Sequence, residues 1–147
     1  MQVGEYFDKY LFEADPALLR RVAERMVGLI PDDTQVLAGL ELGGVPIVTV
    51  LGQLTGLPTA FVRKEPKAYG TRKLAEGSEL SGRRVTLIED VITTGGAVRN
   101  AALALRGLGA RTDLVICAID RQEPGGIVLA EIGVEIRSVL TRTLLDG

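Results

Sequence analysis

The sequence predicts an α/β domain with a central, mostly parallel sheet flanked by helices. Apolar runs of strand length alternate with segments of helical spacing, and glycine-bearing turns follow two of the predicted strands. Strands that alternate with helices are typical of a parallel sheet. The chain has 147 residues, 46% hydrophobic and 24% charged, which suits one globular domain with its own core. We therefore expect a single domain over residues 1–147.

The first half of the chain predicts two helices and two strands. Asp15 followed by Pro16 is an N-cap with proline at the first helical position, and apolar residues at helical spacing follow. Residues 1–12 do not predict a separate element. The expected elements are a helix over about residues 16–29, a strand at 36–40, a helix over about 46–54 and a strand at 59–62.

The second half continues the alternation. We expect a buried strand at residues 85–88, a helix at 97–108, a strand at 111–120, a short helix at 127–132 and a last strand at 134–140. In open α/β sheets the ligand crevice lies beyond the carboxyl ends of the strands. Gly43, Glu89, Asp90 and Arg121 all fall at such ends, so we expect them at one edge of the sheet.

Residues 85–97 carry the strongest chemical signal. The predicted strand ends in Glu89 and Asp90, whose carboxylates can accept hydrogen bonds from a ribose diol. Gly95 and Gly96 allow close approach of a ligand, and the N–H groups of the next helix attract an anion. This order of groups predicts a ribose 5-phosphate site. The alternative is an ordinary strand-to-helix turn with solvated acids. The stretch lacks the sequence of a P-loop, and G-x-G-x-x-G is absent.

The composition excludes several classes of function. The net charge of −2 argues against a general nucleic-acid binder. With no histidine and one cysteine, a zinc site, a Ser-His-Asp triad and a Cys-His pair are excluded. Cys117 lies in an apolar run, so we expect a core residue rather than a nucleophile. No signal peptide or membrane-spanning run is visible. We expect a cytoplasmic protein without membrane or nucleic-acid partners.

The segment from Arg63 to Ser81 is rich in basic residues and poor in apolar ones. Two interpretations remain open: a solvated surface loop, or a mobile basic lid over a polyanion. The basic residues are Arg63, Lys64, Lys67, Arg72 and Lys73.

Residues 89–95 resemble the phosphoribosyl-diphosphate (PRPP) binding motif of type I phosphoribosyltransferases. The resemblance implies the fold of that family, an acidic pair on the ribose hydroxyls and a loop around the 5-phosphate. The implied PRPP-binding residues of this stretch are Glu89, Asp90, Val91, Ile92, Thr93, Thr94, Gly95, Gly96 and Ala97.

Residues 61–77 are similar to the signature loop of orotate phosphoribosyltransferases. The resemblance implies that Arg63, Lys64, Lys67 and Tyr69 bind the diphosphate of PRPP. It also implies a homodimer in which the loop of residues 63–81 reaches the partner's site. Residues 119–123 are similar to a third motif of that family.

The resemblance implies transfer of the 5-phosphoribosyl group from PRPP to orotate, giving orotidine 5-phosphate and diphosphate in pyrimidine biosynthesis. Lys67, Asp90 and Glu89 would be catalytic, and Thr93 and Arg121 would bind orotate. Mg²⁺ would be carried by PRPP rather than held directly by the protein. The alternatives are a phosphoribosyltransferase for another base and a regulator of the same fold that senses PRPP or nucleotides.

The sequence departs from that family at two places. The N-terminal segment that covers the base is expected to be shortened, since the chain begins at about the motif of residues 6–9. Some members carry a lysine in the first glycine turn, where this chain has Gly43. Backbone N–H groups are therefore expected to replace that lysine in contacting the diphosphate.

Overall fold

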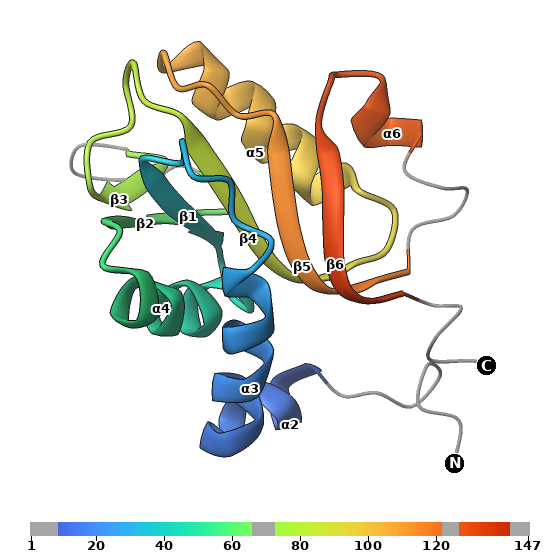
Figure 1. The fold of residues 1–147 in the computed structure, drawn as a ribbon. Helices are drawn as coiled ribbons and strands as arrows, with labels where there is room; N and C mark the ends of the chain where they lie inside the picture. The colour runs from blue at the N-terminus through green and yellow to red at the C-terminus, as the bar shows by residue number, and fades with distance from the viewer. Residues whose placement is uncertain (1–8, 66–72, 122–126, 142–147) are drawn as a thin grey trace.

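The computed structural model describes residues 9–65, 73–121 and 127–141, which form one six-stranded sheet (Figure 1). The strand order is β3-β2-β1-β4-β5-β6. The pair β2–β3 is antiparallel and the other neighbouring pairs are parallel. The predicted mostly parallel sheet is confirmed. The strands are β1 (Val36–Leu40), β2 (Thr59–Val62), β3 (Ala75–Gly77), β4 (Val85–Ile92), β5 (Leu114–Asp120) and β6 (Glu135–Thr141).

Helices cover both faces of the sheet and bury a separate apolar cluster on each. On one face α3 and α4 pack against the strands, and on the other lie α5 and α6 (Figure 1). Met26, Leu51 and Ile88 belong to the first cluster, and Leu87 and Leu105 to the second. In the described ranges no helix is long and apolar enough to cross a membrane. The helices are α2 (Lys9–Ala14), α3 (Pro16–Val27), α4 (Gly44–Thr55), α5 (Gly96–Gly107) and α6 (Ile127–Ala130).

Local sequence signals account for several of the element bounds. The carboxylate of Asp15 accepts hydrogen bonds from the backbone N–H groups of Ala17 and Leu18, at 3.1 and 3.2 Å, so α3 begins at Pro16 as predicted. β1 and β2 have the predicted bounds. The prediction that residues 1–12 form no separate element was wrong for residues 9–12, because α2 begins at Lys9 and contacts α3.

Most predicted bounds differ from the structure by one to three residues, for example β5, which begins at Leu114 and not at Arg111. Two predictions need a larger correction. β4 does not end at Ile88 but continues to Ile92, because β5 pairs with it as far as Ile92 opposite Asp120. The basic segment of residues 63–81 is not a loop throughout. Ala75–Gly77 forms β3, which pairs antiparallel with β2 at the edge of the sheet. Residues 66–72 of that segment lie outside the described residues.

The amino ends of β1, β4 and β5 are joined by polar contacts. The Arg84 guanidinium pairs with Asp33 at 3.0 Å and with Asp113 at 2.7 Å. The hydrogen bond and the negative charge of Asp113, followed by the charge of Asp33, raise the pKa of Arg84. At the same end of the sheet, the side-chain hydroxyls of Thr34 and Thr86 share a buried hydrogen bond of 2.7 Å. These contacts fix the end of the sheet opposite the predicted site.

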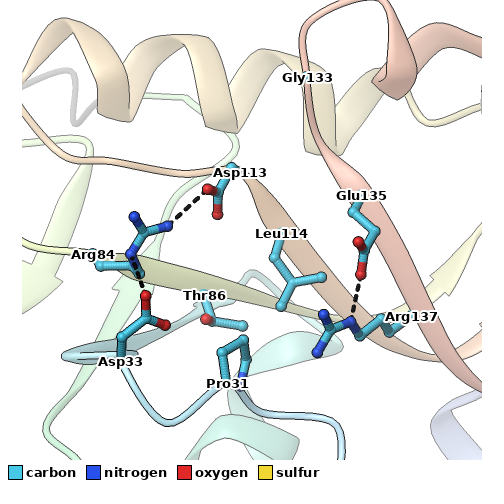
Figure 2. A pocket seen from close by; sticks show the side chains of 9 residues that line it. All are labelled: Pro31, Asp33, Arg84, Thr86, Asp113, Leu114, Gly133, Glu135 and Arg137. Atoms are coloured by element: carbon cyan, nitrogen blue, oxygen red, sulfur yellow. Dashed lines mark hydrogen bonds and ion pairs between the residues drawn. The ribbon is translucent and has the colours of Figure 1, made fainter.

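A hollow of about 410 Å³ lies beside the ion pairs of Arg84 (Figure 2). Arg84 lies on one side of it and Arg137 on the other, and Arg137 pairs with Glu135. Because each guanidinium already faces a carboxylate, the hollow offers no excess of positive charge to a polyphosphate. It lies at the amino ends of the strands and is separate from the predicted site.

Cys117 is fully buried in β5, as the sequence predicted. Burial raises the pKa of its thiol well above the ordinary value of 9.0, and the negative charges of Asp120, Glu89 and Asp90 add to the shift. The thiol therefore stays protonated in the folded protein, which does not suit a nucleophile.

We predict that this thiol makes the protein less stable in alkali. Above pH 9.0 the thiol of the unfolded chain releases its proton while the buried thiol keeps it. The free energy of unfolding should then fall by about 1.4 kcal/mol per pH unit more than in Cys117→Ala. Urea unfolding of both proteins at about pH 8 and about pH 10 measures the difference. Equal pH dependence in the two proteins would contradict the prediction.

Candidate active site

The candidate site lies where the winding of the sheet reverses. β1 and β4 are parallel neighbours, with Gly39 opposite Ile88. The chain leaves β1 into α4 on one face and leaves β4 into α5 on the other (Figure 1). In open α/β sheets such a switch point is where ligands bind. The predicted edge is confirmed: Gly43 follows β1, Arg121 follows β5, and the acidic pair lies in the carboxyl half of β4 between them.

Glu89 and Asp90 are buried within β4, with 8% and 1% of their surfaces exposed. The sequence placed them at the end of the strand, and β4 continues for two residues beyond Asp90. Because side chains alternate along a strand, these neighbours point to opposite faces of the sheet. Glu89 accepts a hydrogen bond from the N–H of Asp90 at 3.0 Å, and Asp90 accepts one from the N–H of Val91 at 2.7 Å. Both carboxylates are thus held by backbone donors next to them.

The carboxylate of Asp90 lies directly against Gly43. A Cβ atom added to Gly43 would lie 1.9 Å from Oδ2 of Asp90. Gly43 has φ of −64°, an ordinary helical value, so glycine is required here for space and not for backbone conformation. The first glycine turn and the acidic strand therefore fit together only with hydrogen at this position.

The turn after β4 provides donors for an anion. Gly95 has φ of +85°, which favours glycine, and it forms the N-cap of α5 without a side-chain cap. The N–H of Gly96 donates to the hydroxyl of Thr94 at 3.3 Å. Thr93, Thr94 and Ala97 are exposed. The first turn of the 12-residue helix α5 thus presents N–H groups and the positive end of its dipole at the predicted phosphate loop.

Arg121 is tied to the end of β4. Its backbone N–H donates to the carbonyl of Ile92 at 2.7 Å, and its side chain is half-buried. Thr93 follows Ile92 directly, so the chain brings the backbones of the two residues expected to bind orotate to the same end of the sheet.

The described part of the basic segment contacts two carboxylates. Arg63 pairs with Glu76 at 3.2 Å, and the backbone N–H of Lys64 donates to the carboxylate of Glu41. The sequence did not predict a role for Glu76, because residues 63–81 were interpreted as a loop. Strand alternation could have indicated β3, but its three residues are too few to show a pattern. Lys67 and Tyr69 lie outside the described residues.

Among residues 9–65, 73–121 and 127–141, no group of three or more His, Cys, Asp or Glu side chains could hold a metal ion. The oxygen donors of Glu89 and Asp90 are of the kind that Mg²⁺ prefers. They suit a Mg²⁺ ion that keeps most of its ligands from water and a bound phosphate.

Known proteins resemble the chain in both sequence and fold. Residues 12–126 match the family described as phosphoribosyl transferase domain. The orotate phosphoribosyltransferase of a Nocardioides species is 65% identical over 146 residues, which cover 99% of this chain and 82% of that protein.

Two solved structures extend the likeness to the fold. A phosphoribosyltransferase from Corynebacterium diphtheriae is 31% identical with a TM-score of 0.85, and the match covers 95% of this chain and 84% of the other. The orotate phosphoribosyltransferase of Mycobacterium tuberculosis in complex with PRPP is 29% identical with a TM-score of 0.82, covering 95% and 83%. By family match, identity and fold, the chain belongs to the orotate phosphoribosyltransferases, within the type I phosphoribosyltransferase family.

Proposed function

We propose that residues 1–147 act as one domain that transfers the 5-phosphoribosyl group from PRPP to orotate, releasing diphosphate. The supporting observation is the switch point, where a buried acidic pair in β4 is followed, after a short loop, by the N-terminus of α5, which has no side-chain cap. Such an enzyme is a pentosyltransferase of pyrimidine biosynthesis. PRPP carries a 5-phosphate and a ribose diol on one sugar, and the helix N-terminus suits the phosphate while the carboxylates suit the diol.

Binding of the phosphate would position the reacting carbon. The N–H groups at Gly95 to Ala97 and the hydroxyls of Thr93 and Thr94 would hold the 5-phosphate. Val91 and Ile92 set the path of the strand into this loop. Binding energy from the phosphate, remote from the anomeric carbon, then contributes to orienting that carbon.

The acidic pair would act on the ribose. Asp90 and Glu89 would approach the ribose from the two faces of the sheet, each accepting a hydrogen bond from a different hydroxyl, and would favour the positive charge that develops on the sugar as diphosphate departs. Arg121 pairs with the orotate carboxylate or a ring carbonyl, together with Thr93. A ring nitrogen of orotate bonds to the anomeric carbon as the bond to the diphosphate oxygen breaks. That oxygen keeps the electron pair of the broken bond, and the proton of the ring nitrogen passes to the diphosphate or to water.

The departing diphosphate needs positive charge around it. Arg63, Lys64, Lys67 and Tyr69 of the basic loop would supply charge and hydrogen bonds, with Lys67 acting at the leaving group. Backbone N–H groups of the turn at Gly43 would add donors. A Mg²⁺ ion carried by PRPP would neutralise further charge on the diphosphate.

We further propose a homodimer in which the basic loop of residues 63–81 completes the partner's site. Closure of the loop would exclude water, which competes with orotate as nucleophile. A cytoplasmic location suits a chain with one buried, free cysteine.

The first prediction from the proposed function concerns the choice of base. With PRPP and Mg²⁺, diphosphate should be released in the presence of orotate but not of uracil, hypoxanthine or adenine. A diphosphate-coupled assay with each base measures this. Release with another base would assign a different substrate, and PRPP binding without release with any base would indicate a regulator.

The second prediction concerns the space at Gly43. The added methyl group of Gly43→Ala must displace the Asp90 carboxylate, so KM for PRPP should rise by about tenfold or more, a loss of at least about 1.4 kcal/mol. Gly28→Ala is the matched control. Gly28 also has a helical φ, of −67°, and only Arg25 O lies within 4 Å of the added atom, at 3.9 Å. Equal PRPP kinetics in both variants would show that the placement of Asp90 is unimportant.

The third prediction concerns the composite site. Lys67→Ala and Asp90→Asn should each lose most of their turnover while remaining folded. A mixed dimer of the two variants carries one site with both native residues. Refolding an equal mixture should therefore restore about one quarter of the wild-type activity. Absence of recovery in dimers shown to be mixed would place both residues in the same subunit's site.

A further inference from the structure

The base of the basic loop is held by a charged contact on the sheet. Arg63 directly follows β2, and its N–H donates to the carbonyl of Leu74 at 2.8 Å. This bond continues the antiparallel ladder in which Phe61 lies opposite Glu76. Arg63 and Glu76 are diagonal neighbours on one face of the two strands, and their side chains meet at 3.2 Å. We call Arg63, Leu74 and Glu76 the loop base.

A second carboxylate joins the loop base to the candidate site. Glu41 follows β1 and accepts a hydrogen bond from the backbone N–H of Lys64. Two residues later comes Gly43, which lies against Asp90. The residues where the basic loop leaves the sheet are therefore connected to the turn beside the acidic strand.

Glu76 uses only part of the hydrogen-bonding capacity of Arg63. One terminal nitrogen of the guanidinium meets the carboxylate, while the Nε atom is buried without a hydrogen bond among the described residues. The two side chains are 34% and 33% exposed, so the other terminal donors of the guanidinium can still be reached. An arginine held at one edge loses less rotational freedom when its remaining donors bind a phosphate oxygen.

We propose that Glu76 is a positioning residue for PRPP binding: its carboxylate holds the Arg63 guanidinium at the loop base so that the arginine meets the diphosphate already oriented. This inference rests on the proposed function and adds to it Glu76, a residue of the 61–77 stretch to which the resemblance assigned no role. The opposing effect is repulsion between the carboxylate and the diphosphate, which solvent and salt screen at a partly exposed position. Removing the Glu76 charge should weaken PRPP binding if orientation of Arg63 dominates, and should strengthen it if repulsion dominates.

The test is titration calorimetry of PRPP with wild type, Glu76→Gln and Glu24→Gln. Glu24 is the matched control because it forms an exposed ion pair with Arg20, at 3.7 Å on α3. Glu76→Gln should weaken PRPP binding about 3- to 10-fold, the range expected for one long side chain that must be ordered on binding. Glu24→Gln should leave it unchanged. The KM for orotate and the melting temperature should not change in either variant.

A double-mutant cycle shows whether Glu76 acts through Arg63. In an Arg63→Ala background, Glu76→Gln should cause no further loss of PRPP affinity. Equal or tighter binding by Glu76→Gln alone, or additive losses in the double variant, would overturn the inference. Because binding requires no transfer to a base, a wild-type protein that binds PRPP without using orotate would contradict the proposed function alone. The same titrations with inorganic diphosphate test the contribution of the loop base without the sugar. A wild-type protein that binds neither PRPP nor diphosphate would overturn the inference.

Discussion

The parallel pairing of β1 with β4 is the constraint on which the site depends. Its register places the turn after β1 beside Asp90 and sends α4 and α5 to opposite faces. At this junction Gly43 meets the Asp90 carboxylate so closely that a Cβ would overlap it. A different register would separate the two turns, because shifting a strand by one residue moves every side chain to the other face. The buried runs of both strands, apolar on each face, stabilise the pairing.

Charge is distributed unequally between the two ends of the sheet. At the amino ends, Arg84 pairs with Asp33 and Asp113 and so joins β1, β4 and β5, while Arg137 pairs with Glu135 within β6. At the carboxyl ends two buried carboxylates lie beside exposed backbone donors. The first arrangement stabilises the fold, whereas the second supplies separate acceptors and donors for a ligand. The same sheet thus keeps its structural and its chemical charges apart.

Much of the fold and of the site was predictable because the signals are local. The N-cap at Asp15 and the apolar runs of β1 and β2 located those elements, and the glycines after β4 located the start of α5 within a residue. What could not be predicted depends on pairing between distant segments. The extension of β4 to Ile92 requires β5, and the three-residue strand β3 exists only against β2. The contact of Arg63 with Glu76 follows from the pairing of β2 with β3, and the contact of Asp90 with Gly43 follows from the pairing of β1 with β4.

The fit between Gly43 and Asp90 also limits how this protein can evolve. The smallest possible side chain at position 43 already occupies the space of a carboxylate oxygen, so no intermediate size is available to natural selection. A lineage that gains a lysine in this turn must relocate the acid as well. The residue at position 43 and the Asp90 carboxylate thus compete for one volume, which makes two distant parts of the sequence interdependent in the folded protein.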